Sequence, residues 1–256
     1  MSEVLLTRRE GAVLVLSNNN PAARNALSPE FYAALTQALA QAEADPSVGA
    51  IVLTGEGGHF CSGGDLRQLA RRRELPIEER RAKLEGLHDL IRAVRDCRKP
   101  VIAAVEGAAA GAGLSLALAC DMLVAARNAV FSVAYVKVGL TPDGGATAFL
   151  AEFVSRQVLT ELCLTGERIS GERLHALGPV NRLAEPGEAL TQALALAAQV
   201  ATGPDTAMAN IKALCRSAYA QPLADQLELE AQLMVQSQAT EESREGIGAF
   251  LEKRPA

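Results

Sequence analysis

Residues 99–113 read KPVIAAVEGAAAGAG, an apolar run followed by a glycine-rich junction. The run Val101–Val105 has the length and the continuous apolar character of a buried strand, and Lys99-Pro100 ends any helix before it. Glu106-Gly107 and Gly111-Ala112-Gly113 then interrupt the chain before a further apolar segment, which we expect to be a helix. A strand that leads through a glycine turn into a helix is typical of an α/β core.

The residues before this stretch continue the same alternation of strands and helices. Ser28-Pro29 supplies a capping hydroxyl and a proline at the first helical position, and we expect that helix to run to about Ala44. Ala50–Thr54 is another continuous apolar run and predicts a second buried strand. The other expected elements are a hairpin of Val4–Thr7 and Ala12–Leu16 around Glu10-Gly11, and a charged helix from Glu78 to Cys97.

The C-terminal part of the sequence has a different pattern. After about residue 188 it predicts helices alone, over residues 189–201, 206–219, 222–238 and 242–253. We therefore divide the chain into an α/β core, residues 1–187, and a helical region, residues 188–256, suited to a cap or an oligomer surface. A length of 256 residues fits one domain with such an appendage better than two full domains.

The composition and the charge exclude several classes of protein. Hydrophobic residues make up 49% of the chain and charged residues 21%, which is ordinary for a globular protein and excludes wholesale disorder. The formal net charge is -5, so no general surface is available to neutralise phosphates, and we expect no nucleic-acid partner.

The sequence also predicts a cytoplasmic protein without a membrane span. Met1-Ser2-Glu3 carries an acid where a secretory signal carries Lys or Arg, and the most apolar stretch, Val101–Ala126, is interrupted by Glu106 and Asp121. The cysteines number five, an odd count without CxxC spacing, which is typical of reduced thiols and not of disulfides. Three scattered histidines make a His-rich metal centre unexpected, so we predict no metal site.

Glycines are concentrated in residues 59–65, 106–113 and 139–145. None of these segments has the GxxxxGK[ST] or GxGxxG pattern of a phosphate-binding loop. Tight turns alone explain each segment taken singly. The first two together allow a second interpretation, because each follows a strand and each can present a free backbone N–H. Two such donors, helped by the partial positive charge of a helix N-terminus, would form an oxyanion hole.

These segments carry a resemblance to a known family that covers essentially the whole chain. In order and spacing the sequence resembles the crotonase superfamily, the enoyl-CoA hydratase/isomerase family. The segments that carry this resemblance are Asn25-Ala26-Leu27, Phe60–Asp65, Lys99–Val105, Gly111-Ala112-Gly113, Cys120-Asp121, Gly139–Gly145 and the tail Glu245–Arg254.

The resemblance implies an α/β fold of repeated ββα units with a C-terminal helical region that builds homotrimers or dimers of trimers. It implies an acyl-CoA thioester as the ligand, so coenzyme A belongs to the substrate and no further cofactor is expected. The backbone N–H groups of Gly64 and Ala112 correspond to the oxyanion donors. The residues expected near CoA are Arg24, Ser62 and Arg67, with Phe250 and Lys253 reaching the CoA of a neighbouring subunit.

The acids expected of a hydratase are absent from this sequence. Hydratases of the family carry two glutamates, whose positions here are Ser115 and Tyr135, and neither side chain is a carboxylate. Asp143 remains, in Thr141-Pro142-Asp143-Gly144-Gly145. An Asp in such a setting can be a turn residue alone. The isomerase of the family that acts on ring-epoxidised phenylacetyl-CoA has its catalytic Asp in a similar Pro-Asp-x-Gly-Gly setting, and a family dehalogenase has its nucleophilic Asp at this point.

We therefore predict an enoyl-CoA isomerase in which Asp143 is the acid/base and Gly64 and Ala112 hold the enolate oxygen. One carboxylate suffices to move a proton between two carbons, whereas hydration by the two-acid route requires a second.

Four alternatives to the isomerase stay open. They are an enoyl-CoA hydratase, an acyl-CoA hydrolase or dehalogenase with Asp143 as nucleophile, an oxepin-CoA ring-opening enzyme, and a protein that binds CoA esters without catalysis. A Cys61–His59 nucleophile is disfavoured, because no third group is evident to orient the pair.

Overall fold

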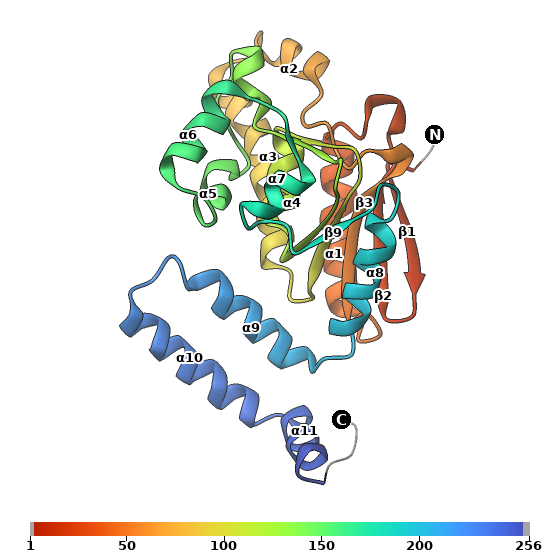
Figure 1. Cartoon of the computed structure of the whole chain (residues 1–256), viewed down its shortest axis with the longest axis vertical. Helices are drawn as coiled ribbons and strands as arrows, with labels where there is room; N and C mark the ends of the chain where they lie inside the picture. The colour runs from red at the N-terminus through yellow and green to blue at the C-terminus, as the bar shows by residue number, and fades with distance from the viewer. Residues whose placement is uncertain (1–2, 253–256) are drawn as a thin grey trace.

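A six-stranded sheet forms the centre of the computed structural model, which describes residues 3–252 (Figure 1). The strands lie in the order β1, β2, β3, β4, β6, β9, and their bounds are Leu5–Glu10, Val13–Asn18, Ala50–Gly55, Val101–Val105, Met122–Ala126 and Arg182–Ala184. β1 pairs antiparallel with β2 across the turn at Gly11, and each later pair in this order is parallel. The expected hairpin and the two expected buried strands are confirmed.

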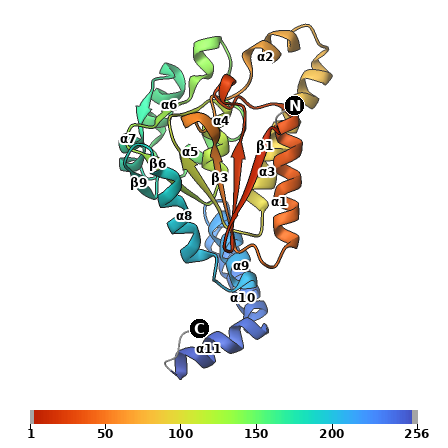
Figure 2. The same ribbon diagram turned by 90° about the vertical axis from the view of Figure 1, so that its right-hand side faces the viewer.

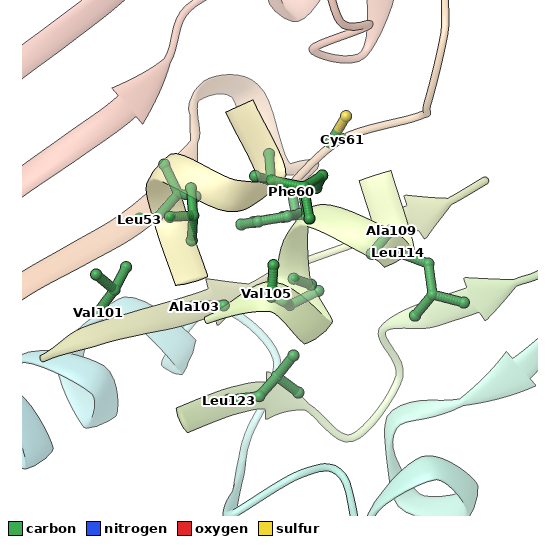
Figure 3. Close-up of a cluster of buried hydrophobic side chains, with 14 of the residues drawn as sticks. Leu53, Phe60, Cys61, Val101, Ala103, Val105, Ala109, Leu114 and Leu123 are labelled. Carbon is green, nitrogen blue, oxygen red and sulfur yellow. The ribbon is translucent and has the colours of Figure 1, made fainter. Parts of the chain in front are cut away.

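The two faces of this sheet bury alternate side chains of each strand. Leu53, Ala103 and Val105 lie in the larger apolar core, which Figure 3 shows in part, whereas Ile102 and Ala104 lie in a second cluster with α8 (Ala189–Val200). Successive side chains of a strand point to opposite faces, so a strand covered on both faces needs apolar residues at every position. That requirement explains the unbroken apolar run 101–105.

Helices α1 (Pro29–Ala44), α3 (Ile77–Asp96) and α4 (Ala112–Ala119) contribute to the larger core. The expected cap of α1 is present, because the Oγ of Ser28 accepts a hydrogen bond from the Phe31 N–H at 3.3 Å. The remaining helices of the core are α2 (Leu66–Arg72), α5 (Ala146–Ala151), α6 (Arg156–Thr165) and α7 (Gly171–Ala176), with short 3₁₀ helices η1 (Pro21–Ala23), η2 (Glu56–Gly58) and η3 (Ala134–Val138).

A second, smaller sheet pairs β5 (Ala108–Ala110) with β7 (Val130–Ser132) and β7 with β8 (Ile169–Ser170). The chain passes from the large sheet to the small sheet and then into a helix twice in succession, through β4, β5 and α4 and then through β6, β7 and the helices after them. These passages are the ββα units that the resemblance implied, so the expected fold is confirmed.

The C-terminal helices are α8, α9 (Asp205–Ser217), α10 (Leu223–Gln238) and α11 (Glu241–Leu251). α8 covers one face of the sheet and packs with the core, whereas α9, α10 and α11 extend away from it (Figures 1 and 2). In terms of packing, the core therefore continues past the expected boundary at residue 188 and takes in α8. Within residues 3–252, no helix is both long and apolar enough to span a membrane, and no three His, Cys, Asp or Glu side chains are grouped to bind a metal.

Lys212 of α9 joins the extended helices to the core. Its Nζ donates to the backbone carbonyls of Cys97 and Lys99, both at 2.7 Å, and lies 2.6 Å from a carboxylate oxygen of Asp121. That carboxylate also accepts from the N–H of Val101 at 2.7 Å, at the start of β4. Burial raises the pKa of Asp121, and the ammonium of Lys212 opposes that rise. The Lys212 ammonium therefore donates hydrogen bonds to the chain between α3 and β4 and is the counter-ion of a largely buried acid.

We predict that Lys212→Met lowers the free energy of unfolding by about 3 kcal/mol, because it leaves Asp121 without its counter-ion in a low-dielectric site. Urea unfolding followed by circular dichroism measures the change. Arg168→Met, at an exposed cation, serves as the control and should change stability by less than about 0.5 kcal/mol. Equal losses in the two variants would contradict the role given to Lys212.

Candidate active site

The loop after β3 is joined to β5 by backbone hydrogen bonds at Cys61. The Cys61 N–H donates to the Ala108 carbonyl at 2.9 Å, and the Cys61 carbonyl accepts from the Ala110 N–H at 3.0 Å. Gly113 lies against the same Cys61 carbonyl, so closely that an added Cβ would clash with it. Gly63 has a φ of +97° and faces the Ala110 carbonyl. Both glycines are therefore required where the first two glycine-dense segments meet.

Asn25 holds the other side of this loop. Its side chain is fully buried, and its Nδ2 donates to the carbonyls of Glu56 at 2.8 Å and His59 at 2.6 Å. Its Oδ1 accepts from the N–H of Asn20 at 2.9 Å. The Asn in the Asn25-Ala26-Leu27 motif is thus a structural clamp, which explains why an amide with both donor and acceptor stands at this position.

Gly64 and Ala112 line the same pocket, one on each of the two joined segments. Ala112 is the first residue of α4, where helical geometry leaves backbone N–H groups without an intrahelical acceptor. Among residues 3–252, neither N–H group donates to another group. Two such unused donors facing one pocket, beside the positive end of a helix dipole, can stabilise a developing oxyanion. The structure thus brings the two predicted donors together.

Asp143 lies in the same pocket, on the loop between η3 and α5. The hydroxyl of Tyr135 donates to its Oδ1 at 2.7 Å, and the Oγ of Ser115 donates to its backbone carbonyl at 2.9 Å. Ser115 and Tyr135 occupy the two positions expected to hold glutamates in a hydratase. Here their hydroxyls fix the loop and the carboxylate of the aspartate.

The phenol of Tyr135 is a permanent donor to Asp143. Burial raises its pKa far above the ordinary value, and the nearby charge of Asp143 and the hydrogen bond to it raise the pKa further. The phenol therefore keeps its proton throughout the neutral range. Because it donates to one carboxyl oxygen of Asp143, it fixes the orientation of that group.

The pocket has a volume of about 500 Å³ and a mostly apolar wall. Such a cavity is large enough for a small acyl group and dry enough to strengthen hydrogen bonds to a developing charge. The apolar residues that line it are Leu66, Leu69, Leu84, Leu87, Ala134, Val138, Leu140 and Pro142.

The predicted CoA-binding residues are only partly assembled at this pocket. Ser62 lines the pocket, its Oγ donates to the Ala23 carbonyl at 3.1 Å, and its N–H donates to the Arg24 carbonyl at 2.9 Å. Arg24 therefore adjoins the site, although it is exposed and does not line the pocket. Arg67 is likewise exposed on α2, and its backbone N–H donates to the Oδ1 of Asp65, which caps that helix.

Of the two residues predicted to reach a neighbouring subunit, the structure describes Phe250, which does not line the pocket of its own chain. Phe250 is 84% exposed on α11, at the far end of the extended helices (Figure 1). Lys253 lies outside the described residues. The expectation that both contact the CoA of another subunit stays a prediction.

Cys61 is unsuited to be a nucleophile. Burial raises the pKa of its thiol to about 12, so almost no thiolate is present at neutral pH. His59 does not contact this thiol, because its Nδ1 accepts from the Ala108 N–H at 3.2 Å. Cys61 is a small residue of the oxyanion loop, in agreement with the interpretation that the sequence favoured.

Tyr32 of α1 lines the pocket and was not expected from the sequence; Arg72 of α2 lines it as well. No motif contains them, and a Tyr next to the buried helix residue Phe31 carries no sign of a pocket position. They reach the same pocket from two separate helices, which is a tertiary property.

A family model named "Enoyl-CoA hydratase/isomerase" matches residues 8–256. The chain belongs to this family. It is 40% identical to a putative enoyl-CoA hydratase of Thermus thermophilus over 96% of this chain and 97% of that protein. It is 35% identical to the 1,2-epoxyphenylacetyl-CoA isomerase of Escherichia coli over 99% and 97%, respectively. The crystal structure of an enoyl-CoA hydratase from Polaromonas sp. JS666 matches with a TM-score of 0.94 and 48% identity, over 98% of this chain and 97% of that one.

Members of the enoyl-CoA hydratase/isomerase family act on acyl-CoA thioesters, and the pocket that Gly64, Ala112 and Asp143 line is the candidate site for such a ligand. The family names of the relatives include both hydratases and an isomerase. The choice between these reactions depends on the side chains in this pocket.

We predict that Tyr135→Phe lowers kcat for the acyl-CoA reaction about tenfold with little change in KM, because Asp143 loses the hydrogen bond that orients its charged group. Steady-state kinetics separates the two constants. Tyr219→Phe is the matched control, since Tyr219 is 76% exposed and does not line the pocket. A Tyr135→Phe variant with unchanged kcat would show that the hydrogen bond has no part in turnover.

Proposed function

We propose that this protein is an enoyl-CoA isomerase in which Asp143 moves a proton between two carbons of an unsaturated or ring-derived acyl group. One observation carries the proposal: among the described residues that line the pocket, Asp143 is the sole carboxylate, and it shares the pocket with the unused N–H groups of Gly64 and Ala112. That set contains one acid/base and one anion-stabilising pair, which are the requirements of a proton shuttle.

The proposed reaction begins when the thioester carbonyl oxygen accepts from Gly64 and Ala112. Polarisation of the carbonyl acidifies the adjacent C–H bond and, in an unsaturated chain, the vinylogous C–H bond. The carboxylate of Asp143 takes the proton, and the electron pair of the broken C–H bond delocalises into a dienolate whose oxygen the two N–H groups hold. Asp143 then returns the proton to a different carbon, so the double bond moves and no atom is gained or lost.

Hydration is the second candidate, and the names of relatives such as the Thermus thermophilus protein favour it. Addition of water needs one group to activate the water and another to deliver a proton to carbon. Ser115 and Tyr135 are poor replacements for a second acid, since both hydroxyls already donate to Asp143. This is the reason for preferring isomerisation. A relative named 1,2-epoxyphenylacetyl-CoA isomerase supports the same choice.

We further propose that coenzyme A binds along Arg24, Ser62 and Arg67 as part of the substrate, with no additional cofactor, in a cytoplasmic homo-oligomer. Support for assembly comes from the extended helices, which expose large apolar side chains to solvent. These include Ile211, Leu223, Leu227, Met234, Val235, Ile247, Phe250 and Leu251. Exposed apolar residues in this number favour an interface over a free surface.

Sedimentation equilibrium at micromolar protein tests the assembly. We expect a mass three or six times 26.9 kDa, because burial of the apolar side chains of α9–α11 between subunits stabilises the oligomer. A mass of 26.9 kDa across the accessible concentration range would rule out both the trimer and the dimer of trimers.

The reaction is tested with a trans-3-enoyl-CoA in deuterated buffer, followed by proton NMR and mass spectrometry. We expect the conjugated isomer to form, and we expect Asp143→Asn to lower its rate at least about a hundredfold, since the acid/base is removed. Binding of the CoA ester, measured by calorimetry, should persist in that variant. Asp225→Asn, at an exposed position on α10, is the control and should keep full activity.

Other products would identify the alternatives. A hydroxyacyl-CoA would show that water adds without the two glutamates, and free CoA would indicate a hydrolase. Binding of 3-enoyl-CoA and aryl-CoA esters with no change in any of them would indicate a protein that binds without catalysis.

A further inference from the structure

Beyond the groups that serve the proposed reaction, the pocket is lined by polar side chains from three different helices. They are Tyr32 of α1, Arg72 at the end of α2, and Lys83 of α3. His88, on the next turns of α3, lines it as well. Four leucines of the apolar wall, Leu66, Leu69, Leu84 and Leu87, also come from α2 and α3.

The hydrogen-bonding capacity of Tyr32 and Arg72 is unused. Within residues 3–252, the Tyr32 hydroxyl makes no hydrogen bond, and the half-buried guanidinium of Arg72 joins neither a hydrogen bond nor an ion pair. Burial raises the pKa of Tyr32 to about 12, the charge of Arg72 opposes that rise, and the charge of Asp143 adds to it. The phenol is therefore a donor at neutral pH and lies within electrostatic range of both charges.

The charges that line the pocket do not balance. Arg72, Lys83 and Lys137 are cations, whereas the one carboxylate among the described lining residues is Asp143, which is held by Tyr135. His88 has its own partner, since its Nδ1 lies 3.6 Å from Glu85. A half-buried arginine without a counter-ion is available to bind an anion that enters the pocket. Arg72 and Tyr32 therefore have the properties of an unfilled anion site.

This anion site belongs to the acyl end of the pocket. The expected CoA side is at Ser62, whose hydrogen bonds lead to Ala23 and Arg24 of the η1 segment. Arg72 and Lys83 line the pocket from α2 and α3, as do the leucines Leu69 and Leu84 that suit an acyl chain. An acyl group that passes Asp143 would share the pocket with both these apolar side chains and the cations.

We propose that the acyl group of the substrate ends in a carboxylate, which binds Arg72 and the Tyr32 hydroxyl with Lys83 nearby. The substrate class is then the mono-CoA thioester of an unsaturated dicarboxylic acid. A guanidinium binds a carboxylate through two parallel N–H···O bonds, and the phenol supplies a third donor. This inference rests on the proposed function, because it assumes that the acyl chain passes Asp143.

Saturated ligands test the proposal apart from the reaction, since they contain no double bond to move. Adipoyl-CoA and suberoyl-CoA are each compared with their ω-methyl esters by calorimetric titration into the wild-type protein. We expect at least one free acid to bind about tenfold or more tightly than its own ester, because the ester lacks the charge that Arg72 and Tyr32 recognise. Equal affinities within both pairs would overturn the proposal.

Two variants assign the preference to this site. Arg72→Gln should reduce the preference for the acid over the ester to less than about twofold. Arg73→Gln, at the exposed next residue that does not line the pocket, is the control and should keep the preference. Unesterified CoA is titrated as well, because its phosphates offer the same anionic chemistry. If Arg72→Gln weakens CoA as much as it weakens the acid, Arg72 binds CoA phosphate and the proposal is overturned.

The two proposals fail separately. Turnover of a neutral 3-enoyl-CoA with no preference for diacids would leave the isomerase in place and remove the anion site. A preference for diacids in a protein that isomerises none of the enoyl-CoA esters would retain the anion site and remove the isomerase.

Discussion

The whole site depends on one close approach, between the loop that follows β3 and the junction of β5 with α4. The Cys61 backbone is hydrogen-bonded to β5, and Gly113 has no Cβ to collide with the Cys61 carbonyl. This contact brings Gly64 and Ala112 to one pocket although 48 positions separate them in the sequence numbering (112 − 64). Because a packed interior cannot yield by much, any side chain at position 113 would move the two donors apart. Precise donor spacing is what makes an oxyanion hole effective.

The reaction that the pocket can perform depends on the side chains that face the two oxyanion donors. The pair of oxyanion donors is shared across a family with several reactions, so it identifies the acyl-CoA thioester and not the product. Selectivity comes from what faces those donors. Here Ser115 and Tyr135 offer hydroxyls, and both are occupied in holding Asp143. The described lining residues include one carboxylate, Asp143, and the hydroxyls of Ser115 and Tyr135 donate to that residue. This arrangement suits the movement of a proton more than the addition of water.

Much of this could be predicted from the sequence, and the limits have physical causes. Val101–Val105 and the Ser28-Pro29 cap are local signals, since burial on both faces and helix capping each depend on neighbouring residues. The roles predicted for Gly64, Ala112 and Asp143 came from the resemblance to the family, because the local sequence alone allowed each to be a turn residue. In contrast, Tyr32 of α1 lines the pocket through tertiary packing, and no local pattern encodes that. The role of α8 was also missed, because an apolar helix gives no sign of whether it covers a sheet or another subunit.

The bond between Tyr135 and Asp143 has a consequence for how such a site can change during evolution. The phenol oxygen lies 2.7 Å from the carboxylate, so a glutamate in its place would set two negative charges against each other in a dry cavity. Two carboxyl groups at that separation could not both stay ionised, so one of them would hold a proton and its hydrogen-bonding role would change. Positions 135 and 143 are therefore coupled, and the effect of a substitution at either depends on the side chain at the other.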